Sequence, residues 1–304
     1  LFVRSADAED ANAVKLGNAA PDDDWYSDRH ISWSPDSKKV VALRTRQGQR
    51  HDVSFVESSP KDQLQPKLHT HQYLKPGDRI PQSIPHLFDV KSKKEITLDN
   101  ELFANPWMSA PGVEWASDSR RFFFTYNQRG HQVLRVISVD ADSGKAATIV
   151  DEQSKTFIDY AYKKYLRILH ETNELIWMSE RDGWNHLYLY NLSTGEVKNQ
   201  ITKGEWVIRK VERIDVENRQ VWFQASGIFE AQDPYYIHHC RVNFDGSGLT
   251  FLTDGDGTHA VSWSPDKKFL VDTYSRVDQP PITELRNAET GELICELERA
   301  DWSR

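Results

Sequence analysis

Several features that mark particular protein classes are scarce or absent in this sequence. Its 304 residues include only two cysteines, Cys240 and Cys295, so a disulfide framework is excluded and no Cys-x-x-Cys pair suggests zinc. No stretch approaches the roughly 18 consecutive apolar residues that a membrane helix needs, and the first residues do not form a signal peptide. We therefore expect no membrane span in this chain, while the cysteine content leaves the compartment open.

Positive charge is also in short supply. The 38 lysines and arginines are outnumbered by 46 aspartates and glutamates, which gives a net charge of −8. Because affinity for nucleic acid depends largely on clustered lysine and arginine, nucleic acid is not expected as a partner.

The motifs of common catalytic sites are missing as well. The sequence has no Gly-x-Ser-x-Gly nucleophile elbow, no glycine-rich phosphate loop and no His-Glu-x-x-His metal motif. It also lacks the alternation of strands and amphipathic helices on which such an elbow is mounted. We therefore expect no catalytic residue, no metal and no cofactor in this chain itself.

A turn motif that recurs between apolar runs is the clearest feature that is present. Its glycines, Gly144, Gly195, Gly248 and Gly291, lie 51, 53 and 43 residues apart, and residues 89–93 are a glycine-free version one period earlier. A period of 40 to 50 residues with one hairpin in each copy is typical of β-propeller blades.

A second motif opens several of the repeats. Trp33–Asp36 and Trp263–Asp266 both read Trp-Ser-Pro-Asp, and Trp115–Asp118 is a variant; an apolar run follows each of them. Proline followed by aspartate favours a tight turn, so each motif is predicted to join two strands. The apolar runs are continuous, as expected of strands that are covered on both faces.

Together the motifs predict an all-β chain of four-stranded antiparallel propeller blades. Residues 1–20 read as the end of a preceding blade, and five blades follow at approximately residues 28–100, 110–151, 155–203, 205–254 and 256–300. Four prolines in residues 63–85 indicate an extended excursion between strands of the first of these blades. A stand-alone five-bladed ring fits the same repeat.

Three short segments are candidates for binding. His69 and His71 are spaced to share a strand face and a metal, but no third ligand is evident nearby, which favours solvated histidines. Residues 254–258 read Asp-Gly-Asp-Gly-Thr like the start of a calcium loop, but the later glutamate is missing, so we interpret them as a turn between blades. The third is the run Asp22, Asp23 and Asp24 beside Trp25, whose carboxylates and ring could hold an ammonium group; a solvated loop is the alternative.

Three longer segments carry a family resemblance. Residues 179–190 (Ser-Glu-Arg-Asp-Gly-Trp-Asn-His-Leu-Tyr-Leu-Tyr), 201–206 (Ile-Thr-Lys-Gly-Glu-Trp) and 269–276 (Phe-Leu-Val-Asp-Thr-Tyr-Ser-Arg) occur in this order. They resemble the N-terminal propeller of dipeptidyl peptidase IV-type serine peptidases, in the prolyl oligopeptidase superfamily. The resemblance runs from about Pro21 to Asp301.

The resemblance implies an eight-bladed propeller that gates substrate access to a C-terminal α/β-hydrolase domain, which cuts peptides after a penultimate proline. This chain would hold about five of the blades and stop before the hydrolase, so we expect it to be non-catalytic and its longer parent to be a serine peptidase. The family's pair of glutamates, which grips the substrate's free N-terminus, is replaced here by Asp22, Asp23 and Asp24. That departure leaves tripeptidyl or oligopeptidase specificity open.

The expected partners follow from the same resemblance. They are a peptide substrate and the hydrolase domain of the same parent, and a periplasmic or secreted location is favoured. An open array of blades would leave edge strands unpaired, which favours either a homodimer or instability. The alternatives are a free-standing interaction scaffold and a propeller enzyme with its site in the channel, although converging carboxylates or metal ligands for the latter are not identifiable.

Overall fold

The computed structural model of the protein describes residues 1–4, 13–17, 24–107 and 111–303. The chain divides into two compact units, Leu1–Ile158 and Asp159–Arg304. Within the described residues no helix has the length and apolar character needed to cross a bilayer. The helical segment η2 (Glu101–Phe103) is a single 3-10 turn.

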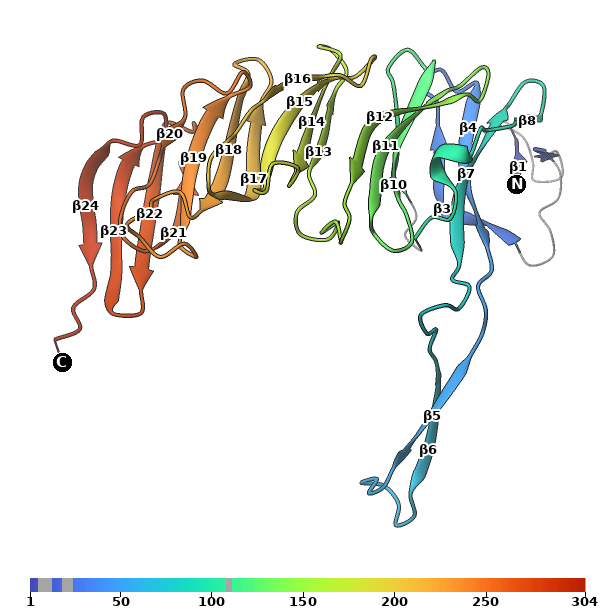
Figure 1. The fold of residues 1–304 in the computed structure, drawn as a ribbon, viewed down its shortest axis with the longest axis horizontal. Helices are drawn as coiled ribbons and strands as arrows, with labels where there is room; N and C mark the ends of the chain where they lie inside the picture. The colour runs from blue at the N-terminus through green and yellow to red at the C-terminus, as the bar shows by residue number, and fades with distance from the viewer. Residues whose placement is uncertain (5–12, 18–23, 108–110, 304) are drawn as a thin grey trace. The chain divides into compact units, whose positions relative to one another are not determined.

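The first unit contains two four-stranded antiparallel sheets (Figure 1). One has the order β3-β4-β7-β8, formed by Asp24–Trp33, Lys39–Arg46, Gln82–Asp89 and Lys94–Ile96. The other has the order β12-β11-β10-β9, with β9 at Val113–Trp115, β10 at Arg121–Asn127, β11 at Val133–Asp140 and β12 at Ala146–Gln153. The unit also contains two separate two-stranded sheets. One is β1 (Phe2–Val3) with β2 (Val14–Lys15), and the other is β5 (Asp52–Glu57) with β6 (Lys67–Gln72).

The second unit contains three sheets, and in each the strands follow chain order. The first comprises β13 (Leu166–Leu169), β14 (Glu174–Ser179), β15 (His186–Asn191) and β16 (Val197–Gln200). The next comprises β17 (Val207–Asp215), β18 (Gln220–Ser226), β19 (Ile237–Asn243) and β20 (Thr250–Phe251). The last comprises β21 (Thr258–Trp263), β22 (Phe269–Arg276), β23 (Gln279–Asn287) and β24 (Leu293–Arg299). The predicted class, all-β with four-stranded antiparallel blades, is confirmed.

Each Trp-Ser-Pro-Asp motif forms the turn between the first two strands of a sheet, as predicted. In the β3–β4 turn the Ser34 hydroxyl donates to Asp36 Oδ1 at 2.8 Å and accepts from the Lys39 amide at 2.9 Å. Ser264 makes the equivalent bonds to Asp266 and Phe269 in the β21–β22 turn, at 2.7 and 3.0 Å. The serine therefore closes the turn through its side chain, which explains its place in the motif.

Neighbouring sheets within each unit pack face to face through apolar side chains. In the first unit Val41 and Leu87 share a buried cluster with Phe122 and Ile137. In the second unit a cluster connects β14 and β15 with β18 and β19, and Phe223 is fully buried there. Removing such a side chain from water contributes about 1.5–3 kcal/mol, so stacking the sheets is the main source of stability.

The glycine turns provide the closest approach between sheets. Gly291, in the β23–β24 turn, has φ +77°, and a Cβ placed there would lie 2.1 Å from the carbonyl oxygen of Phe251 in the neighbouring sheet. Gly144, in the β11–β12 turn, has φ +73° and the same spacing to the Thr97 oxygen. Glycine is thus required both for the left-handed backbone and for the contact.

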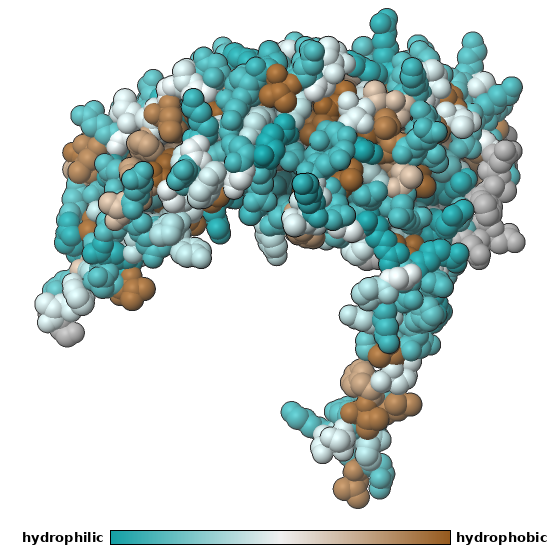
Figure 2. Space-filling view, in the orientation of Figure 1, coloured by the Kyte–Doolittle hydropathy of each residue, from teal (hydrophilic) through white to brown (hydrophobic). Residues whose placement is uncertain are grey.

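The proline-containing excursion differs in detail from its predicted extended form. It carries the hairpin β5–β6, which projects from the sheet between β4 and β7, and it ends within β7, where Pro85 pairs with Leu43 (Figure 1). Strand β8 pairs only with Leu87–Asp89, so the ladder is open beside Pro85 and its missing N–H is tolerated. Apolar side chains gather along the hairpin in Figure 2.

We expect Gly291→Ala to destabilise the protein by about 2–4 kcal/mol, because it combines left-handed strain with a backbone collision. Chemical denaturation measures the change. Gly183→Ala is the matched control: Gly183 has φ +97°, but a Cβ placed there would have no atom within 4 Å. Its cost is therefore limited to about 1–2 kcal/mol of strain. Equal losses for the two variants would contradict a role of Gly291 in sheet contact.

A second prediction concerns pH. His238 in β19 is buried against Phe229 and against His259, whose ring nitrogen Nδ1 lies 2.8 Å from Asp272. Burial, with the adjacent His259, lowers the pKa of His238 to about 4, while Asp254 acts in the opposite direction. Between pH 6.5 and 4 the unfolded chain binds a proton at His238 that the folded chain does not, so the free energy of unfolding decreases as the pH falls through this range.

We expect the His238→Phe variant, which keeps a ring at this position, to lose less stability on acidification. Between pH 7 and pH 4.5 its free energy of unfolding should fall by about 2–3 kcal/mol less than that of the unsubstituted protein. Unfolding curves of both proteins at matched pH values measure this difference. Burial also lowers the pKa of His86, His131 and His186, and these contribute equally to both proteins. Parallel stability profiles for the two proteins would exclude the role of His238.

Candidate substrate-binding site

The three predicted site residues lie at the start of β3. Asp22 and Asp23 fall outside the described residues, and Asp24 is the first residue of the strand. The Asp24 side chain is only 8% exposed, and its Oδ2 lies 3.4 Å from Nε of Arg44 in β4. An ammonium group at Asp24 would therefore share the carboxylate with a guanidinium that is already present.

Further polar groups continue from Asp24 across the same sheet. Tyr26 is the cross-strand partner of Arg44, and its ring contacts His86, whose Nδ1 lies 2.5 Å from Glu95 Oε1. Burial raises the pKa of Tyr26, and Glu95 adds to this effect. Burial also lowers the pKa of His86, outweighing the hydrogen bond to Glu95. These residues form a polar strip on the sheet that carries Asp24, and Arg44 is the member of the strip that contacts the Asp24 carboxylate.

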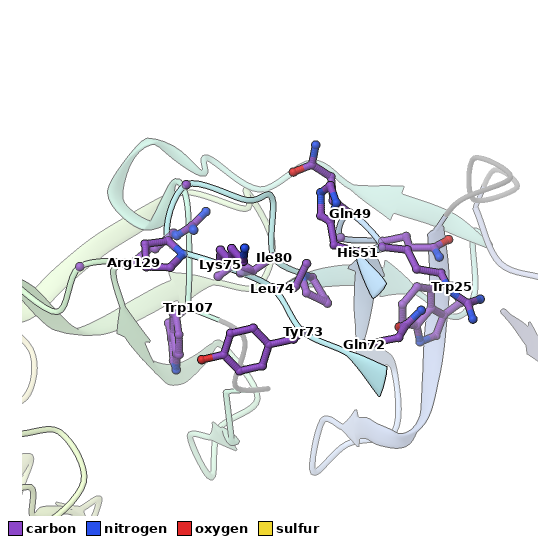
Figure 3. A pocket seen from close by; sticks show the side chains of 17 residues that line it. Trp25, Gln49, His51, Gln72, Tyr73, Leu74, Lys75, Ile80, Trp107 and Arg129 are labelled. Atoms are coloured by element: carbon purple, nitrogen blue, oxygen red, sulfur yellow. The ribbon is translucent and has the colours of Figure 1, made fainter. Parts of the chain in front are cut away.

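A large groove opens beside Trp25, at the base of the hairpin (Figure 3). We call it the neck groove. Its volume is about 1140 Å³. Its walls come from the two chain segments that lead into and out of the hairpin, residues 47–51 on one side and residues 72–77, 80 and 81 on the other, and from Trp107, Arg129 and Gly130 of the connections around β10. In Figure 3 the Tyr73 ring points toward Trp107, whereas Trp25 lies at the opposite end with Gln72 and His51.

Backbone contacts hold both walls of the neck groove. The Gln49 amide donates to the Arg79 carbonyl at 2.6 Å, and the Arg79 amide donates to Gln49 Oε1 at 2.7 Å. On the other wall the Trp107 amide donates to the Asn127 carbonyl at 2.8 Å, and its ring packs edge-on against His131 at 4.7 Å between centroids. The groove is therefore formed before any ligand arrives, which limits the entropy that binding would cost.

The other sequence candidates have internal partners. His69 Nε2 lies 2.8 Å from Glu57 Oε2, and the His69 ring stacks on Phe55; His71 makes a T-shaped contact with the same phenyl ring. In the 254–258 loop, Arg286 binds Asp254 at 2.6 Å and Arg276 binds Asp256. Two arginines thus occupy the carboxylates that a calcium ion would need, and the loop connects β20 to β21 as a turn.

Sequence reasoning missed the neck groove altogether. Its rings and cations come from segments up to about a hundred residues apart, and no spacing in the sequence joins them. The prolines of the excursion were the available signal, since they mark an irregular segment where loops carry functional groups.

The repeated antiparallel four-stranded sheets define the class of protein: a β-propeller region. The sequence matches the family described as the dipeptidyl peptidase IV N-terminal region over residues 23–281. The chain belongs to this family.

Curated relatives agree with this assignment. The chain is 23% identical over 277 residues to dipeptidyl peptidase 4 of Arthroderma otae and, over the same length, 23% identical to that of Trichophyton rubrum. Each match covers 86% of this chain and 35% of the relative. The chain therefore spans about a third of the length of these relatives.

Solved structures show the same fold. Dipeptidyl peptidase 4 of Porphyromonas gingivalis matches with a TM-score of 0.65 and 20% identity, over 89% of this chain and 37% of the other. A putative dipeptidyl aminopeptidase IV of Bacteroides ovatus matches with a TM-score of 0.61 and 18% identity, over 93% and 43%.

Proposed function

We propose that this chain is the non-catalytic, substrate-gating propeller region of a dipeptidyl peptidase IV-like serine exopeptidase that cleaves proline-containing peptides. The observation that carries the proposal is the family match over most of the chain, together with the lack of any nucleophile motif in it. The hydrolase domain would be supplied by the rest of a longer parent protein, in line with the one-third coverage of the relatives. The family match does not favour a free-standing scaffold.

The site proposed to orient the substrate is the acidic run Asp22, Asp23 and Asp24. Of these, Asp24 is positioned by its strand and by Arg44, so its carboxylate is aimed before a peptide arrives. A free N-terminal ammonium would form a charge-assisted hydrogen bond to such a carboxylate. Aspartate is one methylene shorter than the glutamate of the family pattern, so the amine must approach closer to the strand or bind through a water.

We expect Asp24→Asn to raise the KM of the intact protein for free-amine proline peptides by about tenfold with little change in kcat, because uniform binding is lost. The KM for N-acetylated peptides should be the same for the variant and the unsubstituted protein. Steady-state kinetics with each peptide pair measures this. Asp28→Asn, on the exposed part of the same strand, is the control and should have the same KM and kcat as the unsubstituted protein. Equal rates of hydrolysis of acetylated and free-amine peptides by the unsubstituted protein would refute amine recognition.

We also propose that the protein forms a homodimer through the hairpin β5–β6. Its side chains Phe55, Val56 and Leu68 are 52%, 62% and 69% exposed, and they lie on both faces of the hairpin. A two-stranded hairpin is marginally stable in water by itself, so a partner surface that covers these side chains would stabilise it.

We expect the double variant Phe55→Asp with Leu68→Asp to shift the intact protein from dimer to monomer in sedimentation velocity experiments, because burying two carboxylates in an apolar contact is unfavourable. The control is Val277→Asp, which adds a charge at a fully exposed apolar position that is not part of the hairpin. A monomeric parent protein, or a double variant that remains dimeric, would contradict the proposal.

A further inference from the structure

The neck groove has the opposite charge to the chain as a whole. Arg50, Lys75 and Arg129 line it together with His51, and no aspartate or glutamate is among its lining residues. The whole sequence has an excess of acidic residues, with a net charge of −8. A groove without carboxylates in such a chain is a local reversal of charge, and it would attract anions.

The cations of the neck groove differ from other arginines of the unit in their ion pairing. Within the part of the chain that the structure describes, no carboxylate forms an ion pair with Arg50, Lys75 or Arg129. Arginines elsewhere in the same unit are paired: Arg44 with Asp24, and Arg135 with Asp151 at 2.7 Å. His51 has one acidic neighbour, Asp78, at 3.6 Å. The three cations are therefore available to a ligand.

Aromatic rings accompany these cations. Trp25 is 48% exposed and Tyr73 is 57% exposed, although large rings normally gain stability from burial. Tyr73 is held by its amide, which donates to the His51 carbonyl at 3.0 Å. Exposed rings beside unpaired cations suit a ligand that carries both apolar side chains and negative charges.

The layout favours an extended ligand. Figure 3 shows Arg129 and Lys75 toward the Trp107 end of the groove and His51 toward the Trp25 end. The cations are thus spread along the groove and do not converge on one point, as they would around a single phosphate. The volume of about 1140 Å³ lies above the usual range of about 300–1,000 Å³ for small-molecule sites.

The rigid neck supports this function. A Cβ at Gly48 would lie 2.7 Å from both the Arg79 carbonyl oxygen and Pro81, so the two neck segments are in close backbone contact. Arg50 and Lys75 are carried by these segments, and the neck therefore sets the position of two of the three cations before binding.

We infer that the neck groove binds an extended acidic peptide segment, with its carboxylates at Arg50, Lys75 and Arg129 and its apolar side chains on Trp25, Tyr73 and Trp107. The choice of a peptide as the natural ligand rests on the proposed peptide-binding function. It adds a substrate class, since peptides with aspartate or glutamate would be favoured over neutral and basic ones.

The test uses N-acetylated hexapeptides, so that amine recognition does not contribute. Isothermal titration calorimetry compares acetyl-Glu-Phe-Glu-Ala-Glu-Tyr-amide with analogues in which glutamine or lysine replaces every glutamate, each titrated into the intact protein. We expect the glutamate peptide to bind at least about tenfold more tightly than the glutamine analogue, and added salt to weaken it. Equal affinities would overturn the inference.

Variants locate the binding. The double variant Lys75→Gln with Arg129→Gln should weaken the glutamate peptide by about tenfold, and Trp107→Ala should weaken all three peptides. Lys91→Gln with Arg120→Gln removes the same charges from exposed positions of the same unit outside the groove, and should leave binding unchanged. An equal effect of both double variants would mean that net charge alone attracts the peptide, which overturns the inference.

Two further outcomes are informative. A single-stranded oligonucleotide that binds more tightly than the glutamate peptide would overturn the choice of ligand. Free-amine peptides that bind without any preference for glutamate would refute the neck groove inference and leave the proposed amine recognition intact. If the acetylated glutamate peptide binds and a free amine makes no difference to its affinity, the neck groove inference is supported and the proposed amine recognition is refuted.

Discussion

The burial of both faces of short antiparallel sheets is the constraint on which the structure depends. A four-stranded sheet whose inner strand is β14 or β18 is apolar on both sides there, and it is stable in water only when another sheet covers each face. Apolar packing supplies the energy of this stacking, and glycine turns such as that at Gly291 allow the backbones to approach. Because the strands are committed to packing, their ends and connections are left to carry polar function.

Charge is distributed in agreement with this division. In the second unit the buried carboxylate of Glu174 is paired: Arg219 makes two hydrogen bonds to it, at 2.8 and 3.0 Å. Burial opposes the ionisation of Glu174, but the bonds from Arg219 and Lys198 prevail and hold its pKa at about 2. In contrast, the cations of the neck groove lie on connecting segments where no described carboxylate pairs with them. Paired charges such as these belong to the scaffold, and the unpaired cations of the neck groove are those that we propose bind a ligand.

The candidate site combines one feature that is local in sequence with one that is not. Asp24 and Trp25 are adjacent, and their chemistry could be read directly as an ammonium site. The Arg44 contact that competes for Asp24 arises from cross-strand pairing, and the neck groove requires a hairpin excursion to return beside β10. The sequence signal for the excursion was its prolines, and these indicated irregular chain without showing that residues 67–72 pair with residues 52–57.

The sequence by itself determined the repeat, the turns and the class of fold. Serine, proline, aspartate and glycine act on neighbouring backbone groups, so their spacing predicts hairpins without knowledge of the rest of the chain. Only the tertiary structure decided which side chains share a surface: that Asp24 meets Arg44, and that Trp107 and Arg129 face Tyr73 and Lys75. These contacts join residues far apart in the chain, and their positions depend on strand register and on the path of the neck, which no local spacing specifies.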